Sequence, residues 1–200
     1  MTPYSIVAVG TSWGGLSAMA KLFSDLPADF PIPIVVVQHR GKDSDMLLSQ
    51  LLQDSTELKV CEVEDKDALE ARTIHVAPAN YHLMVEPGHV SLTIEEPVRF
   101  SRPSIDVMFD SVADSYGDKA IGVVLTGANN DGARGLAHIV LRGGRALIQD
   151  PKTAEVPTMP EAAIHAVPSA EVLPLKAMAR RLVQLSREDA IKRAGRRTTV

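Results

Sequence analysis

Residues 5–15 read Ser5-Ile6-Val7-Ala8-Val9-Gly10-Thr11-Ser12-Trp13-Gly14-Gly15, an apolar run that breaks into a glycine-rich turn. The run predicts a buried strand, and the helical pattern after the glycines predicts a sharp strand-to-helix turn. Positions 10–14 have the form Gly-x-Ser-x-Gly, in which the flanking glycines let a serine hydroxyl stand exposed above the edge of a sheet. Ser12 is therefore a candidate nucleophile, and the rest of the chain must supply its base.

The composition sets the class of protein. Hydrophobic residues make up 45% and charged residues 23% of the 200 positions, which is typical of a globular protein with one sizeable core. We expect one domain over 1–185 and a basic tail over 186–200, which holds five basic and two acidic residues. Such a tail either docks on an acidic partner or is a solvated terminus.

Charge and apolar runs exclude several classes of partner. The formal net charge of -4 gives no bias toward nucleic acid or an anionic membrane surface. No signal peptide pattern and no apolar run long enough to span a bilayer occurs, so we expect a cytoplasmic protein without membrane insertion. A lone cysteine, Cys61, excludes an internal disulfide and fits a reducing compartment.

Short apolar runs alternate with helical patterns along the chain. This alternation predicts an α/β fold: a doubly wound, mostly parallel sheet with helices on both faces. We expect strands at 6–9, 34–38, 58–63, 121–125 and 146–149, and helices at 14–26, 44–52, 104–116, 133–141 and 159–166. Ser104 and Asp106 fit an N-cap and a first-turn acid. Residues 74–94 form two alternating runs around a turn at 86–89 and predict an appended antiparallel β-hairpin.

Three polar residues follow predicted strands. Ser12 comes after the first strand, His39 after the second, and Asp131 after the strand that ends at 125. Ligands of an open parallel sheet bind outside the carboxyl ends of its strands, so these three side chains should share one edge. Nucleophilic hydrolysis needs this set, because a histidine must take the serine proton and a carboxylate must hold the imidazole.

Each of the three residues also has a purely structural interpretation. Ser12 fits the cap of the following helix, and His39 fits a strand-end histidine satisfied by backbone groups. Asp131 precedes a glycine and fits a turn or a helix cap. Their coincidence at three strand ends favours the catalytic interpretation.

Seven separated motifs, kept in order, extend this pattern over roughly residues 5 to 175. The motifs are Gly10-Thr11-Ser12-Trp13-Gly14-Gly15, Val37-Gln38-His39, Val76-Ala77-Pro78 with Tyr81-His82-Leu83, Arg102-Pro103-Ser104-Ile105-Asp106, Val124-Leu125-Thr126-Gly127 with Asp131-Gly132-Ala133, Gln149-Asp150, and Met159-Pro160-Glu161-Ala162-Ala163. In these motifs the chain resembles the chemotaxis protein-glutamate methylesterases of the CheB type.

The resemblance implies an enzyme that hydrolyses glutamyl methyl esters on the cytoplasmic helices of methyl-accepting chemoreceptors, and some members of the family also deamidate receptor glutamines. Carried over to this chain, Ser12 is the nucleophile, His39 the general base and then acid, and Asp131 the orienting carboxylate. The resemblance implies no metal and no organic cofactor. The two histidines His75 and His82 lack a third ligand at metal-binding spacing.

The substrate pocket and the oxyanion donors are assigned by the same carry-over. Backbone N–H groups of Trp13 and of the loop Gly127, Ala128 and Asn129 would meet the negative charge on the ester oxygen. His82 matches a histidine in the Pro-x-x-x-His stretch of the family, so it is a candidate for the same pocket, and its alternative role is structural support of the hairpin.

The chain departs from the family pattern in three respects. The family usually reads Gly-Ala-Ser-Thr-Gly-Gly around the serine, whereas this chain has Thr11 and Trp13. The family loop Thr-Gly-Met-Gly-x-Asp-Gly here carries Ala128 and Asn129 at the Met-Gly positions. Only four residues precede the first expected strand, where relatives commonly carry a phosphorylation-controlled receiver domain. We expect a free-standing esterase domain or a fragment, open without phosphorylation, with a separate receiver-domain protein as the alternative regulator.

Two other functions remain open from the sequence. One is a non-catalytic chemosensory interaction domain in which Trp13 blocks the pocket. The other is an anion- or nucleotide-binding module, since a glycine-rich turn before a helix can cradle an anion. The second leaves His39 and Asp131 without a role, and neither dinucleotide nor phosphate-loop fingerprints occur.

Overall fold

The computed structural model describes residues 4–41 and 47–197, with side chains up to residue 187. Its centre is a seven-stranded sheet in the order β3-β4-β2-β1-β7-β8-β9, and every pairing in it is parallel. The strands are β1 (Ile6–Thr11), β2 (Ile34–Gln38), β3 (Lys59–Glu62), β4 (Thr73–Val76), β7 (Ala120–Val124), β8 (Arg145–Gln149) and β9 (Glu171–Leu173). The predicted doubly wound parallel sheet is thereby confirmed.

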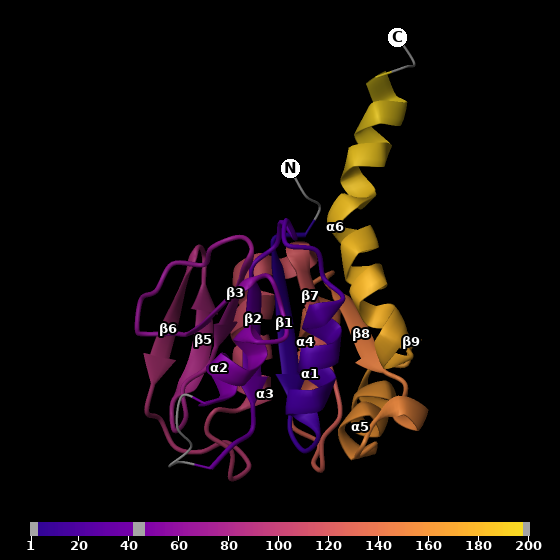
Figure 1. Ribbon diagram of the computed structural model, residues 1–200. Helices are drawn as coiled ribbons and strands as arrows, with labels where there is room; N and C mark the ends of the chain where they lie inside the picture. Colours follow the sequence, from indigo (N-terminus) through magenta and orange to yellow (C-terminus); the bar gives the residue numbers. More distant parts are fainter. Residues whose placement is uncertain (1–3, 42–46, 198–200) are drawn as a thin grey trace.

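Helices cover both faces of the sheet (Figure 1). One face carries α1 (Gly15–Ser24), α2 (Leu47–Gln53) and α6 (Leu175–Arg197), and the other carries α3 (Ile105–Tyr116), α4 (Ala133–Leu141) and α5 (Thr158–Ala166). Two short 3-10 turns, η1 (Gly117–Lys119) and η2 (Pro151–Thr153), join helices and strands. No helix in the described part of the chain is long and apolar enough to cross a membrane.

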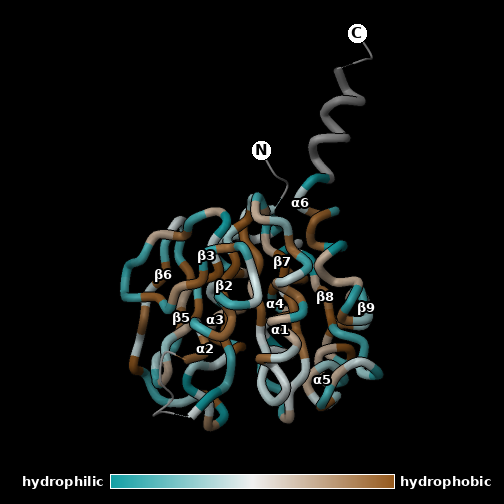
Figure 2. The backbone as a smooth tube through the Cα atoms, in the orientation of Figure 1, coloured by the Kyte–Doolittle hydropathy of each residue, from teal (hydrophilic) through white to brown (hydrophobic). Residues whose placement is uncertain are grey.

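The sheet is buried on both sides, which explains why its central strands lack polar alternation. Val7 and Val9 of β1 belong to the core under α1 and α6, while Ile6 and Ala8 belong to the core under α3 and α4. Strands covered by helices on both faces read as continuous apolar runs. The hydrophobic colouring in Figure 2 accordingly follows the strands of the central sheet.

The hairpin is confirmed in type but not in extent. Strands β5 (His82–Glu86) and β6 (His89–Thr93) form a separate two-stranded antiparallel sheet beside α3, at the flank of the main sheet (Figure 1). The first part of the predicted stretch, residues 74–76, instead belongs to β4 and pairs in parallel with β2 and β3. Its side chains are all buried, as in the other central strands, so the expected hairpin boundary was wrong there.

Two elements near the C-terminal end were not predicted. Strand β9 is only three residues long, and α6 begins at Leu175 and continues across the expected domain end at 185 as one helix. The helix expected at 44–52 begins at Leu47 in the structure, and its first residues lie outside the described part of the chain. The remaining predicted elements agree to within about three residues at each end, as helix and strand boundaries usually do.

The strand order fixes where a site can lie. Strand β1 has β2 on one side and β7 on the other, so the chain order of the strands reverses at β1. Ligands of doubly wound sheets bind at the carboxyl ends of the strands at such a switch point. The loops that leave β1, β2 and β7 carry Ser12, His39 and Asp131.

Candidate active site

Ser12 lies on a turn that is fixed to the neighbouring strand end. Its backbone N–H donates to Thr126 O at 3.0 Å, and its carbonyl accepts from Gly15 N at 2.9 Å and from Gln38 Nε2 at 2.7 Å. Gly14 has φ 76°, in the left-handed region that favours glycine. The turn is therefore rigid around Ser12, whose side chain remains partly exposed.

Thr126 is the hub of this arrangement. Its hydroxyl donates to Trp13 O at 2.9 Å and accepts from Val156 N at 2.9 Å, while its carbonyl also accepts from the Thr11 hydroxyl at 2.9 Å. Its own N–H donates to Gln149 Oε1 at 2.9 Å. One buried threonine thus ties the loops after β1, β7 and β8 together.

His39 and Asp131 form a direct hydrogen bond. His39 Nε2 lies 2.8 Å from Asp131 Oδ2, although the residues are 92 positions apart in the chain. Asp131 is 2% exposed, so this contact is shielded from water. The sequence-predicted histidine and aspartate therefore meet at the sheet edge beside Ser12.

The Asp131 carboxylate is surrounded by donors. Oδ2 also accepts from Ile105 N at 2.7 Å, and Oδ1 accepts from Ser104 Oγ and from Asp106 N, both at 3.0 Å. Gly132 N approaches Oδ1 at 3.0 Å as well. A carboxylate with only donors around it must be ionised, so His39 Nε2 carries the hydrogen of the pair.

The surroundings also set the acidity of Asp131. Burial alone would raise the pKa of this carboxyl. The hydrogen bond from His39 and the N–H groups of Asp106 and Ile105 outweigh burial and hold its pKa below the usual range. The two N–H groups belong to the start of α3, where the helix dipole also favours an anion.

Asp106 is a second buried carboxylate next to Asp131, with the opposite shift. Its Oδ1 accepts from Gly132 N at 3.0 Å and Gly135 N at 2.8 Å, while its buried Oδ2 lacks a hydrogen bond within the described chain. Arg134 Nε lies 3.4 Å from Oδ2 but is more than half exposed. Burial raises the pKa of Asp106 despite the hydrogen bond from Gly135, and the nearby Asp131 charge adds to the effect.

Asn129 contacts the other ring nitrogen of His39. Its Nδ2 lies 3.2 Å from His39 Nδ1, and its Oδ1 accepts from Asp131 N at 3.1 Å. The second contact fixes which end of the carboxamide faces the imidazole, because Oδ1 must be the acceptor. His39 is therefore hydrogen bonded through both ring nitrogens.

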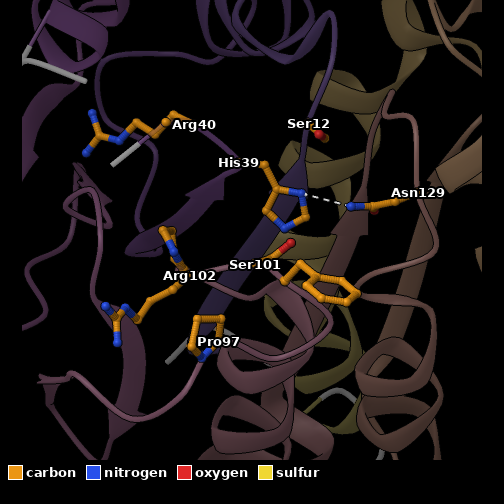
Figure 3. A pocket seen from close by; sticks show the side chains of 10 residues that line it. Ser12, His39, Arg40, Pro97, Ser101, Arg102 and Asn129 are labelled. Carbon is orange, nitrogen blue, oxygen red and sulfur yellow. Dashed lines mark hydrogen bonds between the residues drawn. The ribbon is translucent and has the colours of Figure 1, made fainter. Parts of the chain in front are cut away.

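Ser12 and His39 line two hollows. One, of about 470 Å³, is also bounded by Asn129 and by the loop that precedes α3, as Figure 3 shows for Pro97, Ser101 and Arg102. The other, of similar volume, is bounded by Trp13 and the first turn of α1. In the first hollow stands Phe100, a fully exposed aromatic residue with φ 65°. Ser12 and His39 thus each border two spaces that are open to a ligand.

The predicted pocket residues differ in whether they line a hollow and whether their N–H groups are free to bind a ligand. Trp13 is 66% exposed, its indole N–H donates to Glu155 Oε1 at 3.1 Å, and it lines only the second hollow. The Gly127 N–H donates to Val156 O at 3.0 Å and is not available to a ligand. In the described chain no acceptor contacts the N–H groups of Trp13, Ala128 or Asn129.

His82 does not line either hollow. It is 1% exposed, Nδ1 accepts from Ser104 N at 3.1 Å, and Nε2 lies 3.2 Å from Glu96 O. Its role is to hold Ser104, whose hydroxyl contacts Asp131. Of the two roles expected for His82, the pocket position was wrong, because sequence order places His82 near the site without showing that a loop covers it.

Several site residues were missed at the sequence level. Thr126, Ser104 and Gln38 belong to the motifs, but the sequence alone assigns none of them a contact with the site. A polar residue within a strand that is otherwise apolar is the signal that points to Gln38. For Thr126 and Ser104 the contacts join loops more than twenty positions apart, which no local pattern shows.

The fold and the residues at its switch point define the class: a doubly wound α/β protein with a serine on a sharp turn and a histidine bonded to a buried aspartate beside it. Within that class the chain belongs to the CheB methylesterase family, whose sequence model matches residues 7–182. The resemblance seen in the motifs is thereby confirmed.

Individual relatives agree with this assignment. The chain is 44% identical over 191 residues to a Leptospira interrogans protein with the provisional name protein-glutamate methylesterase/protein-glutamine glutaminase, covering 95% of this chain and 99% of that protein. It is 38% identical over 183 residues to the protein-glutamate methylesterase FrzG of Myxococcus xanthus, covering 91% of this chain and 55% of FrzG. The crystal structure of the Thermotoga maritima CheB methylesterase catalytic domain matches with a TM-score of 0.87 at 32% identity, over 91% of this chain and 98% of that one.

Proposed function

We propose that the chain is a protein-glutamate methylesterase that uses Ser12, His39 and Asp131 as a catalytic triad. The observation that carries the proposal is the 2.8 Å hydrogen bond between the partly buried His39 and the buried Asp131, formed at the same sheet edge as Ser12. Membership of the CheB methylesterase family supports the ester as the substrate class. The second activity named for relatives, deamidation of glutamine, follows from the same chemistry with ammonia as the leaving group.

The reaction runs through an acyl-enzyme. Ser12 Oγ attacks the ester carbonyl carbon while its proton passes to Nδ1 of His39, because Nε2 is committed to Asp131. Collapse of the tetrahedral intermediate breaks the bond to the methoxy oxygen, which leaves as methanol with the proton from Nδ1. A water molecule then repeats the sequence, and the products are a glutamate carboxylate and free Ser12.

The negative charge on the ester oxygen needs donors in fixed positions. The Trp13 N–H directly follows the nucleophile and has no acceptor within the described chain, and the same holds for the N–H of Ala128. Both belong to loops that Thr126 ties together, so we assign the oxyanion site to these two groups. Gly127 contributes close packing rather than a donor.

The proposed substrate is a methylated glutamate on a methyl-accepting chemoreceptor, which places the enzyme in the cytoplasm. The names of the relatives support this substrate class. The proposed enzyme is active without phosphorylation, and control by a separate receiver-domain protein is the alternative. The basic residues of 186–200 remain a candidate contact for an acidic partner.

Methanol release from a methylated receptor tests the function. We expect release by the wild-type chain and at least a 10³-fold slower rate for Ser12→Ala, since the nucleophile is lost. Equal rates for the two chains across several methylated receptors would contradict the proposal. Adding a phosphorylated receiver-domain protein to the same assay tests whether the chain is active alone.

The alternative of a non-catalytic domain blocked by Trp13 receives no support from the geometry. The indole is held to the side by Glu155 and does not line the hollow that contains Asn129 and Phe100. An anion-binding module would leave the hydrogen-bonded His39–Asp131 pair without a role.

A further inference from the structure

Asn129 occupies a position that the proposed mechanism needs for Ser12. The imidazole of His39 has one lone pair, on Nδ1, because Nε2 donates to Asp131. The Asn129 carboxamide donates to this lone pair from 3.2 Å, as the dashed line in Figure 3 shows. In the described chain Ser12 Oγ has no hydrogen bond to His39, although both line the same hollows.

The carboxamide is held in this position. Its Oδ1 accepts from Asp131 N at 3.1 Å, so rotating Nδ2 away from His39 would break a second contact. The side chain is half-buried and lines the hollow in which a substrate would lie. Its backbone φ is not positive, so the position does not require a residue that tolerates left-handed backbone.

We propose that Asn129 is a latch on His39: it occupies the lone pair of the base in the free enzyme, and a ligand that fills the adjoining hollow must displace it. This inference rests on the proposed function, because it assigns Nδ1 as the base. An ester carbonyl oxygen is an acceptor of the kind that can take the Nδ2–H in place of Nδ1. The Ser12 hydroxyl then donates to the released nitrogen, and the reaction becomes dependent on a bound substrate.

A small serine-directed reagent that does not fill the hollow reveals the latch. With a fluorophosphonate, the Ser12 Oγ–P bond forms and the P–F bond breaks, fluoride leaves, and the Ser12 proton passes to His39 Nδ1. A neutral hydrogen bond of this kind corresponds to about a two- to tenfold change in an equilibrium. We expect Asn129→Ala to be labelled at Ser12 faster than the wild-type chain by that factor.

Two further variants separate the latch from other roles. Asn129→Asp keeps the oxygen that accepts from Asp131 N but turns an acceptor toward Nδ1, which favours a proton there, so labelling should be slower than in the wild type. Asn130→Ala is the matched control: it removes an exposed asparagine from the same loop, whose side chain contacts Arg99, and should leave the rate unchanged. Asn129→Gly repeats the test if the alanine variant melts at a lower temperature.

The sign of the effect decides the proposal. Faster labelling of Asn129→Ala and Asn129→Gly supports the latch. Labelling that is unchanged or slower in both overturns it, because a residue that only holds the Asp131 loop, or that donates to the reacting oxygen, gives a loss. If the wild-type chain is labelled at Ser12 but releases no methanol from receptors, the proposed function fails. The labelling rates of the variants still test the latch in that case. Absence of Ser12 labelling in the wild type and in the Asn129 variants alike overturns both.

Discussion

Ser104 donates its hydroxyl to Asp131 at 3.0 Å and leaves the capping of α3 to that carboxylate. A serine directly before a helix usually accepts from the first-turn N–H groups itself. Here Asp131, from the loop after β7, accepts from the N–H groups of Ile105 and Asp106 instead. The Asp131 carboxylate therefore caps the start of α3. In turn, the N–H groups of α3 hold the carboxylate that orients His39 in the proposed triad.

Removing the Ser104 hydroxyl should destabilise the start of α3 and the Asp131 carboxylate together. Hydrogen bonds to charged groups contribute about 1.5–3 kcal/mol, so we expect Ser104→Ala to lower the free energy of unfolding by about that amount in urea titrations. Ser24→Ala is the control, because that exposed hydroxyl contacts only the Lys21 carbonyl of its own helix, and its effect should be small. Equal effects of the two substitutions would show that the Ser104–Asp131 contact does not stabilise the fold.

Replacing the carboxylate should abolish activity. In Asp131→Asn the amide hydrogens face groups that are all donors, namely His39, Ser104 and the N–H groups of α3. The imidazole then loses the partner that fixes its tautomer, and a loss of about 10⁴-fold in kcat is the scale known for such substitutions. Steady-state methanol release measures it, and retention of more than a tenth of the wild-type kcat would remove Asp131 from the mechanism.

The part of the site that depends on strand ends was predictable from the sequence. Ser12, His39 and Asp131 each follow a buried apolar run, and parallel strands bring their carboxyl ends to one edge whatever the length of the connections. The hairpin at 82–93 was equally readable from its turn residues.

What the sequence did not show are contacts made between loops. His82 was expected in the pocket, yet it is buried beneath Ser104, because the loop before α3 folds over it. The Gly127 N–H was expected to face the substrate, yet Val156 takes it. Both outcomes depend on the path that a loop takes in three dimensions. Loops have no periodic pattern in the sequence that would indicate this path. Strand β9 was missed because three residues are too short for a pattern.

The stability of the fold should depend on pH through Asp131. Its pKa is lower in the folded chain than its ordinary value, so the stability it contributes is complete above the pKa of the unfolded chain, near about 4. That contribution is lost as the pH falls through the folded pKa. The gap in unfolding free energy between the wild type and Asp131→Asn should therefore narrow as the pH falls below about 4. A gap that stays constant from neutral pH down to about 3 contradicts this assignment.

Asp106 should show the opposite dependence. Its pKa is raised in the folded chain, first by burial, so its contribution to stability is present below the unfolded pKa and lost as the pH rises through the folded pKa. Asp106→Asn keeps an oxygen that can accept from Gly132 and Gly135, and it removes the buried charge. We expect this variant to gain stability relative to the wild type as the pH rises from acid to neutral. Urea titrations at several pH values measure the trend, and a relative loss toward neutral pH would show that the contact with Arg134 outweighs burial.

Gly127 should tolerate no side chain. A Cβ there would lie 1.9 Å from Met159 Sδ and 2.9 Å from Ser12 Cβ, so Gly127→Ala must displace the methionine, the serine turn, or both. Overpacking of this kind typically costs about 1–3 kcal/mol of stability, and a shifted Ser12 should also react more slowly with a fluorophosphonate. Adding Met159→Ala relieves the contact with the methionine. The double variant should therefore lose less stability than the sum of the losses in the two single variants. Gly88→Ala is the control for loss of stability alone: the hairpin turn has open space there, but its φ of 86° strains an alanine, and Ser12 labelling should stay at the wild-type rate. Wild-type labelling of Gly127→Ala would mean that the turn accommodates the methyl group and that close packing at Gly127 is not what positions the nucleophile.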